Sequence, residues 1–190
     1  MIEVSKIVQV LYHILVKIGP TDKIKLVKLV YLSDKYHLLK YARTITNDSY
    51  FAMKLGPVGS TLKDILAFNK NLAISKEEFD YTSSLIEQEN DFTFKAKGSK
   101  RVLSDFLSET DLEAIDFIIE KFGSMSQWDL KNFTHKYPEW KQYKELFKSN
   151  TISRENIRIQ ELISTIPEDP FSFSSKHLEE VKSIISGMHD

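Results

Sequence analysis

The sequence predicts a mainly α fold: a compact helical domain with a small β-hairpin element and a C-terminal helical extension. Apolar residues recur at spacings of three and four along most of the 190 residues, which is the period of an amphipathic helix. Helix-capping residues precede these stretches, and Gly or Pro follows several of them. Apolar and polar residues alternate, as in a half-buried strand, within residues 79–97. We expect the helical domain to span residues 1–148 and the extension residues 149–190.

Two long helices begin the chain. The first is predicted over residues 4–18, and Gly19-Pro20 ends it. Thr21 or Asp22 then caps a second helix that runs to about Tyr41. The middle of this second helix, residues 29–32, is apolar on every side, so we expect it at the centre of the core.

An extended segment is predicted between residues 43 and 58. Asn47-Asp48 is a turn signal, and residues 49–55 lack helical spacing. Gly56-Pro57-Val58 is expected to form a tight turn that fixes this segment against the second helix, because Gly allows unusual dihedral angles and Pro fixes φ.

A third helix, opened by Ser60 or Thr61 and running to about Asn69, precedes a two-stranded hairpin. The hairpin is predicted because apolar and polar residues alternate on both sides of a polar turn over residues 87–91. Its first strand carries Phe79, Tyr81 and Leu85, and its second carries Phe92, Phe94 and Ala96. A lone hairpin is marginally stable in water, so we expect its aromatic face to pack on the helices.

The remaining chain is predicted to be helical. Ser108 caps a helix that Gly123 ends, and Ser126 begins another that ends before Pro138. The extension holds two helical pieces, around residues 159–166 and 178–188, joined by a loop over residues 167–175.

The composition excludes several classes of protein. The chain has no cysteine, which excludes a disulfide scaffold, thiolate catalysis and Cys-ligated zinc. Charged residues break the apolar positions of residues 2–18, so no signal peptide is predicted. No apolar run reaches the roughly 18 residues of a membrane span, so we expect a cytoplasmic protein that does not contact a membrane.

Motifs for catalysis and metal binding are missing. The five histidines form no i, i+4 pair, and the six glycines form no phosphate-binding loop or nucleophile elbow. We therefore expect no metal, no cofactor and no catalytic residue. A hydrolase using Asp34, His37 or His135 is the least favoured alternative.

Charge is distributed unevenly along the chain. The net charge is −1, but residues 1–63 hold ten basic and four acidic residues, so this third carries +6 and the remainder −7. Such asymmetry indicates either a solvated helix face or a surface for an acidic partner. A nucleic-acid-binding regulator is therefore an alternative function, with phosphate contacts from Lys17, Lys23, Lys25, Lys28 and Lys35.

Two stretches carry unusual polar and aromatic residues. The first runs from Lys25 to Val58 and contains K-L-V-K-L-V-Y at residues 25–31, Y-A-R-T-I at residues 41–45, Asp48 and the Gly56-Pro57-Val58 triplet. The second, residues 126–140, contains Thr134-His135 followed by Trp140.

Together these stretches resemble the Panacea antitoxin domain, a family that includes SocA-like antitoxins and phage-associated GepA-like proteins. The likeness covers about residues 4–140. The chain departs from the family pattern at Ala42, where Gly is frequent, and at Thr44, where Pro is frequent. The resemblance implies a helical fold with a small β element and an antitoxin of a toxin–antitoxin system, as found in prophages.

The resemblance also implies a protein partner. Family members neutralise a cognate toxin by direct binding, and some resemble adaptors that deliver the toxin to a protease. The family has no established catalytic residues. Aromatic and Arg side chains dominate most interfaces, so our candidates for partner binding are motif residues, each of which could instead belong to the core: Tyr31, Tyr36, Arg43, Tyr50 and Trp140.

Overall fold

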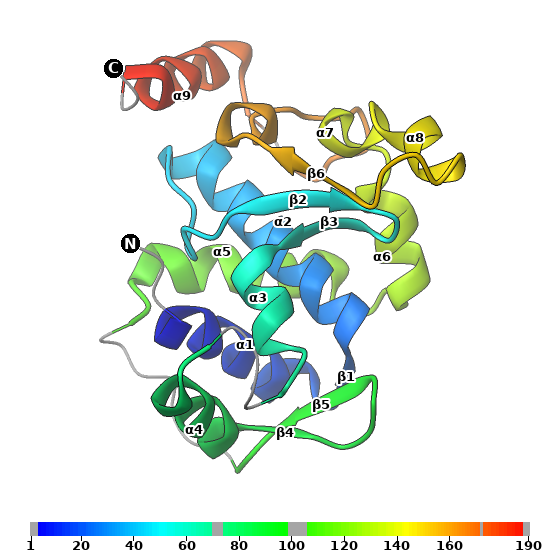
Figure 1. Ribbon diagram of the computed structural model, residues 1–190. Coiled ribbons are helices and arrows are strands. Elements are labelled where there is room, and N and C mark those ends of the chain that lie inside the picture. The colour runs from blue at the N-terminus through cyan, green and yellow to red at the C-terminus, as the bar shows by residue number, and fades with distance from the viewer. Residues whose placement is uncertain (1–3, 70–73, 99–105, 172, 188–190) are drawn as a thin grey trace.

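The computed structural model describes residues 4–69, 74–98, 106–171 and 173–187 (Figure 1). The helices are α1 (Val4–Ile18), α2 (Lys23–Tyr41), α3 (Ser60–Ile65), α4 (Lys76–Leu85), α5 (Glu109–Phe122), α6 (Gln127–Thr134), α7 (Pro138–Lys141), α8 (Lys144–Lys148), a 3-10 turn η1 (Ile159–Leu162) and α9 (Ser175–Gly187). The strands are β1 (Thr21–Asp22), β2 (Tyr50–Met53), β3 (Gly56–Gly59), β4 (Ile86–Gln88), β5 (Thr93–Ala96) and β6 (Arg154–Ile157). The prediction of a mainly α fold is confirmed.

Helix α2 lies at the centre of the molecule, as predicted. It packs against α5, α6, α9 and strand β3 (Figure 1), and every residue from Lys28 to Leu39 is buried. The Asp22 carboxylate caps its N-terminus by accepting a hydrogen bond from the Ile24 amide at 2.7 Å. Its C-terminal cap is Ala42 at φ +56°, a left-handed conformation that Gly adopts more easily. This conformation explains why Gly is frequent there in the family pattern.

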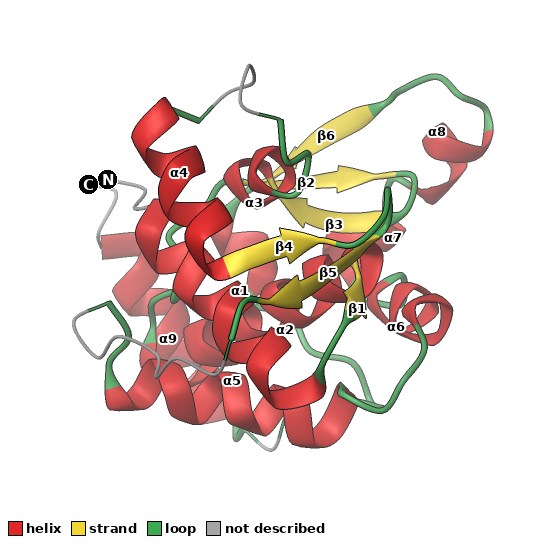
Figure 2. Ribbon diagram, turned by 90° about the horizontal axis from the view of Figure 1, so that it is seen from below, coloured by secondary structure: helices red, strands yellow, loops and turns green. Residues whose placement is uncertain are grey.

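Two three-stranded antiparallel sheets replace the single hairpin that we predicted (Figure 2). One has the strand order β1-β5-β4 and the other β3-β2-β6. In the second sheet Phe51 faces Val58 and Ala52 faces Pro57, so the Gly56-Pro57-Val58 triplet is strand rather than turn. The turn consists of Lys54 and Leu55. Because β3 is an edge strand, Pro57 is tolerated without a ladder amide.

The predicted first strand of the 79–97 hairpin is wrong, because Phe79, Tyr81 and Leu85 belong to helix α4. Ser75 and Glu78 form a reciprocal capping box that begins this helix. The hairpin itself is shorter, with Ile86 facing Ala96 and Gln88 facing Phe94. The alternation predicted the second strand correctly at Phe94 and Ala96, whereas Phe92 lies before β5 and is 58 % exposed.

The C-terminal region differs most from the prediction. The helix predicted over residues 159–166 is wrong, because only the short turn η1 lies there, and strand β6, paired antiparallel with β2, precedes it. Residues 149–190 contribute buried side chains to the common core: Ile157, Leu162, Ile163, Phe171, Val181 and Ile185. The last predicted helix is present as α9, and Met188 lies outside the described residues.

Within the described ranges, no helix combines the length and apolar character needed to cross a lipid bilayer.

Candidate functional site

Helix α2 carries a row of buried polar side chains that contact other parts of the chain. Lys28, Asp34, Lys35 and His37 are all at most 2 % exposed. Burying such groups costs free energy unless each has a partner, so their contacts determine how the rest of the molecule is arranged around α2.

Asp34 holds the loop that follows α2. Its carboxylate accepts hydrogen bonds from the amides of Ile45 at 2.7 Å and Thr46 at 3.0 Å, from the Thr46 hydroxyl, and from the Tyr50 hydroxyl at 2.7 Å. Burial raises the pKa of Asp34 above its ordinary value, and these four hydrogen bonds oppose that rise. The loop and the start of β2 are thereby fixed to the helix.

Glu139, at the start of α7, is the centre of a second buried cluster. Its carboxylate accepts hydrogen bonds from the Tyr31 hydroxyl at 2.5 Å, Lys35 Nζ at 2.6 Å and the Ser164 hydroxyl at 2.6 Å. Lys35 Nζ also donates to the Leu162 carbonyl oxygen at 2.8 Å. Burial lowers the pKa of Lys35, and the adjacent Glu139 charge opposes that shift. This cluster joins α2, α7 and the segment after β6.

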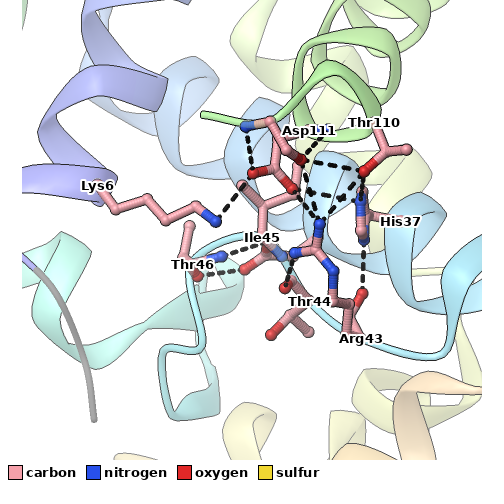
Figure 3. A network of polar contacts seen from close by, with 10 residues as sticks. Lys6, His37, Arg43, Thr44, Ile45, Thr46, Thr110 and Asp111 are labelled. Carbon is pink, nitrogen blue, oxygen red and sulfur yellow. Dashed lines mark hydrogen bonds and ion pairs between the residues drawn. The ribbon is translucent and has the colours of Figure 1, made fainter. Parts of the chain in front are cut away.

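Asp111, in the first turn of α5, anchors a third cluster (Figure 3). Its carboxylate lies 2.9 Å from Lys6 Nζ, 3.0 Å from the Arg43 guanidinium and 3.3 Å from the His37 ring. His37 Nδ1 donates to the Arg43 carbonyl oxygen at 2.7 Å. Burial alone raises the pKa of Asp111, but the Lys6 and Arg43 cations and a Ser108 amide hydrogen bond bring it below its ordinary value.

The β2–β3 hairpin, residues 50–59, is held from two sides. From α2, Lys28 Nζ donates to the Pro57 carbonyl oxygen at 2.7 Å. From α7, Trp140 Nε1 donates to the Met53 carbonyl oxygen at 2.8 Å, and its ring stacks on His135 with the centroids 3.4 Å apart. The two sequence stretches that carried the family resemblance therefore meet at this hairpin.

Gly56 allows the close approach of α2 to the hairpin. Its φ is +107°, and a Cβ atom there would lie 2.7 Å from Lys28 Nζ and 3.2 Å from the His135 ring. Burial is the main cause that lowers the pKa of Lys28 to about 7. Burial, with the Lys131 and Lys28 charges, lowers the pKa of His135 to about 4, so this ring is neutral near pH 7.

A cavity of about 640 Å³ opens beside the hairpin, and we call it the lysine pocket. Its aliphatic walls come from α2, β3 and the end of α3, through Ile24, Val27, Val58 and Leu66. Among the described residues, four lysines line it, Lys23, Lys28, Lys54 and Lys63, and no acidic residue does. The pocket lies next to the Lys28 contact that holds the hairpin, so the hairpin forms part of its wall.

The predicted partner-binding residues are placed mostly inside the protein. The side chains of Tyr31, Tyr36, Tyr50 and Trp140 are buried. Arg43 is the exception, because its side chain is 45 % exposed while its guanidinium pairs with Asp111. The structure brings Tyr31 and Tyr50 together, with ring centroids 5.7 Å apart. Partner contact by these residues stays a prediction.

The lysines proposed for phosphate contacts have other surroundings in the structure. Lys28 and Lys35 are buried, Lys17 pairs with Asp116 at 3.3 Å, and Lys25 donates to the Gly123 carbonyl oxygen at 2.6 Å. Lys23 Nζ lies over the Phe92 ring. Among the described residues, no group of three or more acidic or His side chains is arranged to hold a metal ion.

Sequence reasoning missed the role of Glu139 and of the buried lysines. One signal was available: Lys28, Tyr31 and Lys35 are spaced by three and four, so they share one face of the helix. Glu139 gave no comparable signal, because its partners are about a hundred residues away in the sequence.

This arrangement defines a helical domain built around a central helix with buried polar side chains and a hairpin that is hydrogen-bonded to that helix and to α7. Residues 26–141 match the model of the family described as antitoxin SocA-like, Panacea domain. The chain belongs to this family, which confirms the resemblance and supports an antitoxin-type, regulatory function. Neither a curated protein nor a solved structure matches the chain.

Proposed function

We propose that this protein is the antitoxin of a toxin–antitoxin pair and neutralises its cognate toxin by direct protein–protein contact. The family match is the observation that carries the proposal. It spans residues 26–141, and so contains α2, the β2–β3 hairpin and the Trp140 contact that holds it. The residues that carry the family pattern thus contact one another around the hairpin.

The three buried carboxylates support a binding function rather than catalysis. Asp34, Asp111 and Glu139 each have several partners within the chain, and each joins elements that are distant in the sequence. A general acid or base needs a geometry that reaches a substrate. Asp34 and His37 instead use their hydrogen-bonding capacity on the loop after α2, which disfavours the hydrolase alternative.

The nucleic-acid alternative has weaker support. Non-specific DNA binding depends on exposed cations that can contact phosphates. Lys28 and Lys35 are buried, and Lys17 already pairs with an acidic residue of α5. Delivery of the toxin to a protease, and a prophage setting, rest on the family resemblance alone and stay expectations.

Co-expression tests the proposal. The protein encoded next to this chain's gene is induced in a host cell, with and without this chain. We expect growth arrest by the neighbouring protein, recovery when this chain is present, and co-purification of the two through a tag on either one. Recovery of growth without a complex, or no recovery, would contradict neutralisation by contact.

A further inference from the structure

The lysine pocket has walls suited to an apolar side chain. Ile24 and Val27 line it from the first turns of α2, Val58 from β3 and Leu66 from the end of α3. A cavity of about 640 Å³ lies within the range of pockets that bind ligands or side chains. The hairpin that forms one wall is fixed by Lys28 and Trp140, so the pocket does not have to be formed on binding, which lowers the entropy cost of association.

The charge around the pocket has one sign. Lys23, Lys54 and Lys63, the partly or fully exposed lysines of its lining, are its rim lysines, and Lys28 is buried. Lys63 is 3.9 Å from Asp64, at the limit of an ion pair, and in the described part of the chain no carboxylate pairs with Lys23, Lys28 or Lys54. The pocket therefore favours an occupant that carries negative charge around an apolar group.

Two exposed apolar side chains flank the pocket. Leu55, on the turn of the β2–β3 hairpin, is 45 % exposed and lines the pocket. Phe92, before β5, is 58 % exposed and contacts Lys23, whose Nζ lies 4.9 Å from the ring centroid. The turns of the two hairpins lie on the same side of the molecule in both views (Figures 1 and 2). Leu55 and Phe92 thus extend the apolar surface beyond the pocket.

We propose that the lysine pocket, with Leu55 and Phe92 beside it, is the docking surface for an acidic segment of the toxin that inserts one apolar side chain. This inference rests on the proposed antitoxin function and assigns the surface that performs it. The inserted side chain contacts the aliphatic walls, and carboxylates next to it pair with the rim lysines. The centre of the contact is desolvated and its rim is charged, as in most protein interfaces.

A protein segment fits this surface better than a nucleic acid. Single-stranded nucleic acids stack their bases on open aromatic faces. The pocket walls are aliphatic, and Lys23 lies over the Phe92 ring. The pocket is thus suited to an aliphatic or aromatic side chain that has acidic residues next to it.

Matched surface variants test the docking surface. We compare Leu55→Asp and the double variant Lys54→Glu, Lys63→Glu with controls on α9, namely Ile184→Asp and the double variant Lys176→Glu, Lys182→Glu. Leu55 and Ile184 are similarly exposed, at 45 % and 48 %. Helix α9 packs near the C-terminal end of α2, whereas the pocket lies at its N-terminal end (Figure 1). Circular dichroism and thermal unfolding confirm that each variant is folded.

The measurement is the Kd of each purified variant for the purified toxin, at low and moderate salt. We expect both pocket variants to bind at least about tenfold more weakly, and the α9 controls to bind as the unaltered protein does. The lysine double variant should also reduce the salt dependence of association, because rim charges act mainly on the association rate.

The outcomes separate the two proposals. If the unaltered protein does not bind the toxin, the proposed function fails and the docking surface fails with it. If it binds and the pocket variants bind equally well, the function stands and the surface is wrong. Binding of DNA in a gel shift, lost only in the lysine double variant, would assign the surface to nucleic acid. A dimer of this chain that Leu55→Asp dissociates would assign the surface to a second copy.

Discussion

At the scale of single residues, the fold depends on buried polar side chains that hold distant segments together. Lys35 and Glu139 are an example, because both are inaccessible to solvent and share a hydrogen bond of 2.6 Å. Removing one partner of such a pair leaves an uncompensated buried charge, which typically costs about 3–5 kcal/mol. These residues therefore specify how α7 and the segment after β6 sit against α2.

Gly56 provides a residue-scale prediction with an internal control. Gly19 and Gly56 both have positive φ, but a Cβ atom at Gly19 meets nothing within 4 Å, whereas at Gly56 it meets Lys28. Gly19→Ala should cost about 1–2 kcal/mol for the left-handed conformation alone. Gly56→Ala should cost about 3 kcal/mol or more, because overpacking adds to the strain.

Chemical denaturation of the two glycine variants measures both costs. Equal losses of unfolding free energy would show that Lys28 moves aside without cost and that the hairpin is not tightly held. A Gly56→Ala variant that keeps its stability but loses toxin binding would assign the hairpin to the interface alone.

At the scale of elements, the β3-β2-β6 sheet depends on the segment that follows residue 148. Strand β6 pairs with β2 along its whole length, from Tyr50 facing Ile157 to Met53 facing Arg154. The hydroxyl of Ser164 and the carbonyl of Leu162 complete the partners of Glu139 and Lys35. Helix α9 adds a hydrogen bond from His177 to the Leu39 carbonyl oxygen at the end of α2.

A shortened chain that ends at residue 148 tests how far this dependence goes. It lacks six buried apolar side chains: Ile157, Leu162, Ile163, Phe171, Val181 and Ile185. At about 1.5–3 kcal/mol for each, their loss amounts to roughly 9–18 kcal/mol, which reaches or exceeds the stability of a typical domain. We expect the shortened chain to show no cooperative thermal unfolding. A cooperative transition like that of the full chain would establish residues 1–148 as an independent domain.

The elements also show which parts of the fold could be predicted from the sequence. Helices α1, α5 and α6 were predictable because their apolar period agrees with the cap or stop residue at an end, and α2 because its Asp22 cap precedes a long apolar stretch. Helix α4 was mistaken for a strand because its apolar residues are few, although Ser75 and Glu78 form a capping box. Strand β6, Arg-Glu-Asn-Ile, has no alternating pattern, and its pairing with β2 is a long-range effect.

The candidate site was also predictable only in part. The two motif stretches marked the correct region, since Gly56, His135 and Trp140 meet at the hairpin. Which side chains are buried could not be derived from residue types. Tyr and Trp occur both in cores and at interfaces, and only the three-dimensional structure distinguishes the two.

At the scale of the whole molecule, the uneven charge of the sequence is largely balanced within the fold. Basic residues of the first 43 positions pair with acidic residues of α5: Lys6 and Arg43 with Asp111, Lys17 with Asp116, and Lys40 with Glu113. The lysines around the pocket lack such partners among the described residues, apart from the marginal contact of Lys63 with Asp64. Among the basic residues of the first 63 positions, most of those left without a carboxylate partner in the described residues therefore line the proposed docking surface.

The central claim is neutralisation by contact without chemical turnover, and a stoichiometric titration tests it most directly. Purified toxin is mixed with increasing amounts of this protein, and the residual toxin activity is measured before and after the two are separated under mild denaturing conditions. The account predicts a linear loss of activity that is complete at a fixed whole-number ratio, and full recovery after separation. Durable inactivation by sub-stoichiometric amounts of this protein would contradict it, because the toxin would then have been modified rather than bound.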